Sequence, residues 1–165
     1  MGKRNDPVNH PTHYTDSFDT LPVECIDLTQ YQTFCAGNVT KYLFRCGQKD
    51  IGDNGYQDFK KAIWYFKQHN KLPIKYHFTG NESVAQAIFS TKFPEPDREK
   101  DPIKFMRWRL IDFCIGEDIF RNNISDKPMH WYHLMIDSFI NFHREMTARG
   151  LWPQEELWSE EPSHV

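Results

Sequence analysis

The stretch FCAGNVTKYLFRCGQK, residues 34–49, decides the fold class because its apolar and its polar positions both repeat at helical spacing. The apolar positions of this stretch are Cys35, Val39, Leu43 and Cys46. Gly47 follows the last of them, where a glycine commonly ends a helix. The pattern therefore predicts a helix over about 33–47 that buries one face, and we interpret the cysteines on that face as core thiols.

The opposite side of the same helix carries Asn38, Lys41 and Arg45 at spacings i, i+3 and i+7, which place them in one row. An amide, an ammonium and a guanidinium in a row suit an anionic ligand, and phosphate is the usual candidate. Gly37 permits the close approach of another backbone or of a ligand. A solvated helix face explains the row equally well, so the pattern alone leaves both interpretations open.

Further helical patterns cover most of the remaining chain, at about 22–32, 56–70, 83–93, 102–121 and 127–149. We therefore predict an all-α protein. Its N-terminal module over 1–70 combines three helices with an ordered, proline-rich leading loop. A mostly helical C-terminal region follows over 71–154, in which residues 71–83 form either a short strand or an extended connection. Residues 155–165 form an acidic tail, and we expect the end of the chain from residue 154 to be mobile.

Composition limits the function classes. The net charge is −3, and residues 1–70 carry eight basic and eight acidic side chains, so no global attraction to nucleic acid is expected and any basic site is local. No apolar run approaches the ~20 residues of a membrane span, and no apolar signal segment begins the chain. We expect a cytoplasmic protein without membrane contact. The four cysteines match no zinc pattern, and no metal site is predicted.

The helix over 56–70 carries a second polar row, Asp58, Lys61 and Tyr65, again at i, i+3 and i+7. If the two helices pack antiparallel, this row borders the first one. A carboxylate beside several cations can orient them or act as a base. The alternative is an ordinary Asp–Lys pair on the surface.

The leading loop contains HPTHY, residues 10–14. Two histidines are too few for a metal site, but His10 and His13 can donate to a phosphate or a base edge and Tyr14 can stack on a base. Glu24 lies just inside the first predicted helix, where it complements the helix dipole or accepts a hydrogen bond from a ribose or base.

Two more polar patterns occur in the C-terminal region. His130, His133 and Asp137 form a row that resembles a helical metal pair only loosely, and we interpret it as a packing face. Lys104, Arg107 and Arg109 either form a second anion patch or flank a core tryptophan, Trp108. No GxxxxGK[ST] and no GxGxxG occurs, so neither a P-loop nor a Rossmann enzyme is supported.

Four motifs in their shared order carry a resemblance over about residues 6–70: DPVNHPTHY, VECI, FCAGNVTKYLFRCGQK and QDFKKAIWYF. The chain resembles a small phage domain family formerly of unknown function, whose characterised relative is the nucleotide kinase of T-odd coliphages. The positions that match the family motifs are His13, Tyr14, Glu24, Gly37, Asn38, Lys41, Tyr42, Arg45, Gly47, Lys49, Asp58, Lys61 and Ala62.

The resemblance implies phosphoryl transfer from a nucleoside triphosphate to a deoxynucleoside monophosphate such as dTMP or dGMP, without a P-loop and in a homo-oligomer. Three departures weaken that implication. Gln48–Lys49 stands where the kinase relative has two lysines. The extra sequence follows the shared domain rather than preceding it. The segment between Glu24 and Phe34 is also shorter.

Side-chain chemistry suggests the roles. Lys41, Arg45, Asp58 and Glu24 are the predicted catalytic residues, the cations for charge neutralisation and the carboxylates for orienting the nucleophile. The predicted substrate-binding residues are His10, His13, Tyr14, Asn38, Lys49 and Lys61. No motif requires a cofactor, although Mg²⁺ is compatible with the triphosphate donor. Two alternatives stay open: a non-catalytic nucleotide-binding or sequestering protein, and an all-α nucleoside triphosphate pyrophosphohydrolase.

Overall fold

The computed structural model describes residue 14 and residues 24–48, 51–71, 82–123 and 129–158, which form six α-helices, one 3₁₀-helix and no strand. The elements are α2 (Cys25–Thr29), α3 (Phe34–Arg45), η1 (Ile51–Asp53), α4 (Tyr56–Lys71), α5 (Glu82–Lys92), α6 (Pro102–Asn123) and α7 (Met129–Ala148). The all-α prediction is confirmed over these residues. The expected leading loop and the connection over residues 72–81 lie outside them.

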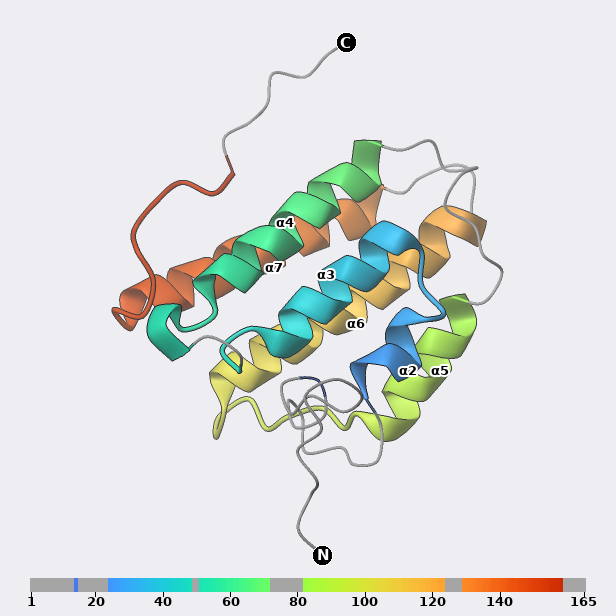
Figure 1. Cartoon of the computed structure of the whole chain (residues 1–165), viewed down its shortest axis with the longest axis horizontal. Coiled ribbons are helices and arrows are strands. Elements are labelled where there is room, and N and C mark those ends of the chain that lie inside the picture. The colour runs from blue at the N-terminus through green and yellow to red at the C-terminus, as the bar shows by residue number, and fades with distance from the viewer. Residues whose placement is uncertain (1–13, 15–23, 49–50, 72–81, 124–128, 159–165) are drawn as a thin grey trace, which may run out of the picture.

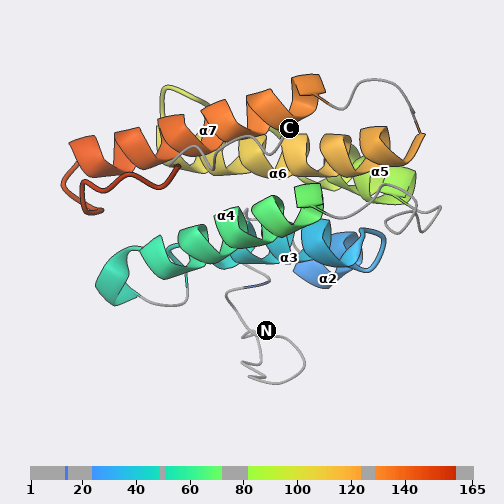
Figure 2. The ribbon, with the colours of Figure 1, turned by 90° about the horizontal axis from the view of Figure 1, so that it is seen from above.

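The helices form two layers. Helices α2, α3 and α4 lie side by side in one layer, and α5, α6 and α7 lie in the other (Figures 1 and 2). Helix α3 packs against α6, and α2 packs against α5. The C-terminal region therefore contributes the whole second layer, and the buried side of α3 rests directly on it.

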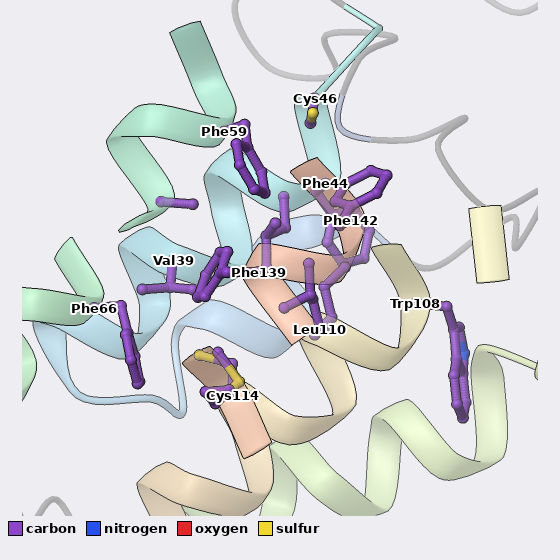
Figure 3. Packing of buried hydrophobic residues seen from close by; sticks show 14 of the residues in the cluster. Val39, Phe44, Cys46, Phe59, Phe66, Trp108, Leu110, Cys114, Phe139 and Phe142 are labelled. Carbon is purple, nitrogen blue, oxygen red and sulfur yellow. The ribbon is translucent and has the colours of Figure 1, made fainter. Parts of the chain in front are cut away.

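Aromatic side chains fill the space between the layers, as Figure 3 shows for part of the core. Phe59 of α4 meets Phe139 and Phe142 of α7 with ring centroids 5.6 and 5.5 Å apart, and Phe44 of α3 meets Phe93 at 5.4 Å. Edge-to-face pairs at such distances add to the hydrophobic free energy of burial. The residues predicted to form the inner face of α3 are all buried: Cys35, Val39, Leu43 and Cys46.

Gly47 marks the C-terminal end of α3, and Gly37 determines how closely a neighbouring segment can pack against this helix. Gly47 follows the helix with φ +76°, a left-handed conformation that glycine adopts at little cost, as the helix-stop prediction requires. A Cβ atom on Gly37 would lie 3.3 Å from the carbonyl oxygen of Thr29. Gly37 therefore permits the close approach of the last residue of α2, the backbone alternative of the two that the sequence left open.

The first helix is shorter than predicted. The sequence pattern predicts a helix over about 22–32, whereas α2 covers only Cys25–Thr29. Glu24 lies at the N-cap in extended conformation, rather than inside the helix, and its N–H donates to Asp27 Oδ2 at 2.8 Å. Such a bond satisfies a backbone donor at the helix start, and Asp27 is the residue that provides it.

The chain after α7 packs on the protein, which corrects the expectation that it is mobile from residue 154 onward. Trp152 is buried and donates its Nε1–H to the carbonyl oxygen of Asn54 at 3.0 Å. Tyr56 forms a hydrogen bond with the carboxylate of Glu155. The ring of Trp158 lies 6.1 Å from that of Phe66. Residues 151–158 thus cover part of α4 and α7, whereas residues 159–165 lie outside the described chain.

Candidate functional site

The polar row on α3 faces away from the second layer, because the opposite side of the helix is the one buried against α6. Within the row, the side-chain amide of Asn38 donates to the carbonyl oxygen of Phe34 at 2.8 Å and accepts from Lys41 Nζ at 2.7 Å. The amide therefore holds the lysine ammonium in place. The sequence predicts a phosphate contact for Asn38, whereas the structure engages its side chain in positioning Lys41.

Arg45 pairs with the carboxylate of Asp58 across the two helices. Its Nε lies 2.8 Å from Asp58 Oδ2, and the two side chains are only 11% and 4% exposed. Its Nη1 donates to the hydroxyl oxygen of Tyr14 at 3.3 Å. The prediction that the second polar row borders the first is thus confirmed, since α3 and α4 run antiparallel and bring Arg45 opposite Asp58.

Lys61 completes the group. Its Nζ lies 4.0 Å from Asp58 Oδ1, and its side chain is 51% exposed. Among the described residues, this buried carboxylate oxygen has no hydrogen-bond donor. We call Lys41, Arg45, Asp58 and Lys61 the cationic cluster. Three cations against one carboxylate leave a local excess of positive charge, although the chain as a whole is acidic.

Burial and neighbouring charges shift the pKa values of two members of the cluster. Burial lowers the pKa of Lys41, and the nearby charge of Arg45 lowers it further. Burial alone would lower the pKa of Arg45 as well, but its hydrogen bonds to Asp58 and Tyr14 outweigh that effect and raise it. Arg45 is therefore a fixed cation, whereas Lys41 is destabilised in its charged form and would gain from an anionic ligand.

The three cations of the cluster lie close to one aromatic ring. The ring of Tyr42 has Lys41 Nζ at 4.5 Å, the Arg45 guanidinium at 5.3 Å and Lys61 Nζ at 5.5 Å from its centroid. Tyr65 stacks on Tyr42 at 5.7 Å with an interplanar angle of 21°. These contacts favour the cations electrostatically and restrict their positions.

The other predicted site residues divide into two groups. His10, His13 and Lys49 lie outside the described residues. Glu24 immediately precedes Cys25, whose thiol is close enough to Lys41 for each charge to affect the pKa of the other. Glu24 is therefore the sequence neighbour of a residue that interacts electrostatically with Lys41.

Sequence reasoning missed two exposed aromatic residues at the same face, Phe34 and Trp64, which are 75% and 55% exposed. Both rings contact Tyr65 edge-on, with centroids 6.0 and 4.8 Å away. The available signal was spacing, since Phe34 lies at i−4 from Asn38 and Trp64 at i+3 from Lys61.

The polar patterns of the C-terminal region lie partly in the core and partly on an exposed helix face. Trp108 is buried and donates to the carbonyl oxygen of Phe93 at 2.9 Å, and the buried Arg107 donates to the carbonyl oxygen of Cys46 at 2.6 Å. Arg107 therefore flanks a core residue, the second of its two interpretations. His133 and Asp137 are exposed on α7, which corrects their assignment to a packing face. Within the described residues no group of three His, Cys, Asp or Glu side chains could hold a metal ion.

No helix in the described parts of the chain is long and apolar enough to cross a membrane.

The residues that build the cationic cluster lie in a segment that matches a known family. Residues 8–67 match the profile of a family described as protein of unknown function (DUF3310). The chain is similar to that family over this segment, which is less than half of its length. The expected resemblance to a small domain family with a phage relative is confirmed. A curated relative, the gene 1.7 protein of Enterobacteria phage T3, is 33% identical over 72 residues, which cover 39% of this chain and 44% of the relative. The chain thus spans less than half the length of that relative, and no solved structure matches this chain.

Proposed function

We propose that this protein is a phage nucleotide kinase that transfers a phosphoryl group from a nucleoside triphosphate to a deoxynucleoside monophosphate, without a P-loop. The observation that carries the proposal is the cationic cluster, where three cations converge beside one buried carboxylate. Phosphoryl transfer asks a protein mainly for positioning and for neutralisation of charge on the transferring group. The family resemblance supports the same reaction, and the acceptor would be dTMP, dGMP or a similar nucleotide.

The reaction assigns a task to each member of the cluster. An oxygen of the acceptor phosphate attacks the γ-phosphorus, a new P–O bond forms, and the nucleoside diphosphate leaves with the electrons of the broken bond. Lys41 and Arg45 would neutralise the equatorial oxygens of the transferring group. Asp58 orients Arg45 and Lys61, and its second oxygen can accept a hydrogen bond from a bound water or hydroxyl group.

Several predictions from the sequence stay predictions. These concern binding by His10, His13 and Lys49, the role of Glu24, assembly into a homo-oligomer and action in the cytoplasm of an infected bacterium. Mg²⁺ would arrive with the triphosphate, and Asp58 is a carboxylate of the cluster that could contact it.

A non-catalytic nucleotide-binding or sequestering protein is the second candidate. One observation favours it: Asp58, the carboxylate of the cluster, accepts a hydrogen bond from Arg45. The cations of the cluster can bind an anion, whereas the carboxylate that would act as a base is already paired. A pyrophosphohydrolase is the third candidate. All three need phosphate contacts at the same face, and they differ in their products.

One assay separates these functions. The full-length protein is incubated with dTMP or dGMP, ATP and Mg²⁺, and separately with each deoxynucleoside triphosphate, and the nucleotides are resolved by ion-exchange chromatography. A kinase yields deoxynucleoside diphosphate, a hydrolase yields monophosphate and pyrophosphate, and a sequestering protein binds without turnover. The kinase proposal is overturned if no diphosphate forms with any monophosphate.

Lys61→Ala tests the site itself, with Lys60→Ala as the matched control one residue away. Lys61 is half exposed, so its removal leaves little buried charge uncompensated. We expect Lys61→Ala to lower kcat/KM about tenfold or more, as for loss of one charge-assisted phosphate contact. Lys60 pairs with Glu155 on the other side of α4, and its removal should leave kcat/KM unchanged. Equal effects of the two variants would argue against this face as the site.

A further inference from the structure

Two large aromatic side chains are exposed beside the cationic cluster without an assigned role. Phe34 begins α3 and is 75% exposed, and Trp64 on α4 is 55% exposed. Folding normally buries such rings, and an exposed pair on one face commonly marks a contact with something outside the chain. We call Phe34, Tyr42, Trp64 and Tyr65 the aromatic shelf.

The aromatic shelf is continuous with the cationic cluster. Tyr65 contacts Phe34 and Trp64 edge-on at interplanar angles of 70° and 87°, and it stacks on Tyr42 at 21°. The Tyr42 ring in turn lies within 5.5 Å of three cationic groups. A ligand that covers both surfaces must therefore carry a flat apolar part and an anionic part, joined by a short spacer.

The helix geometry sets the length of that spacer. Phe34 and Lys41 are seven residues apart on one side of α3, which corresponds to about 10 Å along the axis. Trp64 and Lys61 are neighbours at i, i+3 on α4, with Cβ atoms about 5–6 Å apart. Base, sugar and phosphate of one nucleotide span separations of this kind. Figures 1 and 2 show α3 and α4 side by side in one layer.

We propose that the aromatic shelf is the nucleobase subsite, where Phe34 and Trp64 stack with the base of the nucleotide whose phosphate lies on the cationic cluster. This inference rests on the proposed function for the phosphate half of the ligand. Stacking on aromatic faces tolerates different bases because every base has a π-face, and purines offer the larger one. The subsite therefore accepts more than one base and binds purine nucleotides more tightly than pyrimidine nucleotides.

The charge of the surroundings favours a nucleotide over a second copy of this chain. Lys41, Arg45 and Lys61 border the shelf, and the chain is acidic overall, but an isologous dimer through this face would bring the two cationic clusters toward each other. Such a contact places like charges together in a partly desolvated interface, which opposes association. A nucleotide instead brings negative charge to the cations.

The test measures binding of four probes to the full-length protein by titration calorimetry: dGMP, dTMP, deoxyribose 5-phosphate and deoxyguanosine. We expect dGMP to bind more tightly than dTMP, and deoxyribose 5-phosphate to bind at least tenfold more weakly than dGMP. Phe34→Ala and Trp64→Ala should each weaken dGMP binding about tenfold and leave binding of deoxyribose 5-phosphate unchanged. Trp64→Phe should restore most of the loss, because it keeps a ring.

Leu151→Ala serves as a matched control, since Leu151 is an exposed apolar residue remote from this face in the chain. Sedimentation velocity on each variant reports the assembly state. Equal affinities for dGMP and deoxyribose 5-phosphate would overturn the subsite and leave the proposed phosphate site standing. Altered assembly with unchanged dGMP binding would assign the shelf to a second copy and overturn the inference. If none of the three phosphate-bearing probes binds, the proposed function is overturned. If deoxyguanosine still binds in that case, the aromatic shelf binds a base without a phosphate site beside it.

Discussion

Two polar clusters flank α3, and each is built around a buried carboxylate. At the outer face, the buried carboxylate of Asp58 holds cations whose other sides reach solvent. Between the layers, the carboxylate of Asp118 is fully buried and is held by Thr33 at the start of α3. Burial of a carboxylate alone does not distinguish a binding site from a structural tie. The difference lies in whether its partners remain accessible.

The inner cluster connects three helices. Asp118 of α6 accepts from the hydroxyl of Thr33 at 2.6 Å and from its backbone N–H at 3.0 Å. His69 Nε2 of α4 lies 2.8 Å from Glu117 Oε2 and 4.0 Å from Asp118 Oδ1. All three ionisable side chains are at most 2% exposed. This cluster ties the start of α3 to α6, and α6 to α4.

Arg45→Ala should produce the largest effect and affect the outer cluster in two ways. Turnover by the proposed kinase should fall at least about 1000-fold, since the cation proposed to neutralise the transferring group is lost. The free energy of unfolding should fall by about 3 kcal/mol, because Asp58 is left buried without its partner. A product assay and urea denaturation measure the two effects.

The double variant Arg45→Ala, Asp58→Asn separates the two effects of that change. Neutralising residue 58 should recover much of the stability without recovering turnover. If the double variant regains turnover, or if Arg45→Ala keeps it, Arg45 has no role in the reaction.

Asp118 should make the inner cluster sensitive to pH. Burial raises the pKa of Asp118 to about 6 from an ordinary 3.8, against the opposing effects of His69 and Thr33. Between these values the folded protein holds a proton that the unfolded chain has released, so stability falls as pH rises through this range. The stability associated with protonated Asp118 is fully present below about pH 4 and is lost above about pH 6. The loss amounts to about 3 kcal/mol.

Asp118→Asn removes this titration. The difference in unfolding free energy between Asp118→Asn and the unmodified protein should shift by about that amount between pH 4 and pH 7, in favour of the variant at pH 7. Glu117 and His69 are present in both proteins that are compared. A constant difference across this range would show that Asp118 does not titrate as inferred.

Thr33→Ala should have the smallest of these effects. It removes one hydrogen bond to a buried carboxylate at a helix N-cap, which costs about 1–2 kcal/mol of stability. Thr33→Ser keeps the hydroxyl and should retain most of it, as measured by urea denaturation. Nucleotide affinity should change little in either variant, in contrast to Arg45→Ala. A large affinity loss in Thr33→Ala with an intact fold would mean that the two clusters are coupled through α3.

Much of the outer site was predictable from spacing. The i, i+3, i+7 rows on α3 and α4 each contained the residues that the structure brings together, and the Arg45–Asp58 contact needed only the antiparallel packing of adjacent helices. The engagement of Asn38 with Lys41 was not predicted, because the amide of a surface asparagine can turn either toward its own helix or toward a ligand. The start of the first helix was predicted too early, which placed Glu24 inside the helix instead of at its N-cap. Helix ends are set by capping contacts that periodicity does not show.

The sequence by itself determined the helices, their buried faces and the two polar rows, because these depend on local periodicity. Only the tertiary structure decided what lies across from what. Asp118 and Thr33 are 85 residues apart, and Tyr56 and Glu155 are 99 apart, so no local pattern could pair them. The aromatic shelf belongs to the same class. Phe34 and Trp64 become one surface only when α3 and α4 pack, since each alone is a single exposed ring.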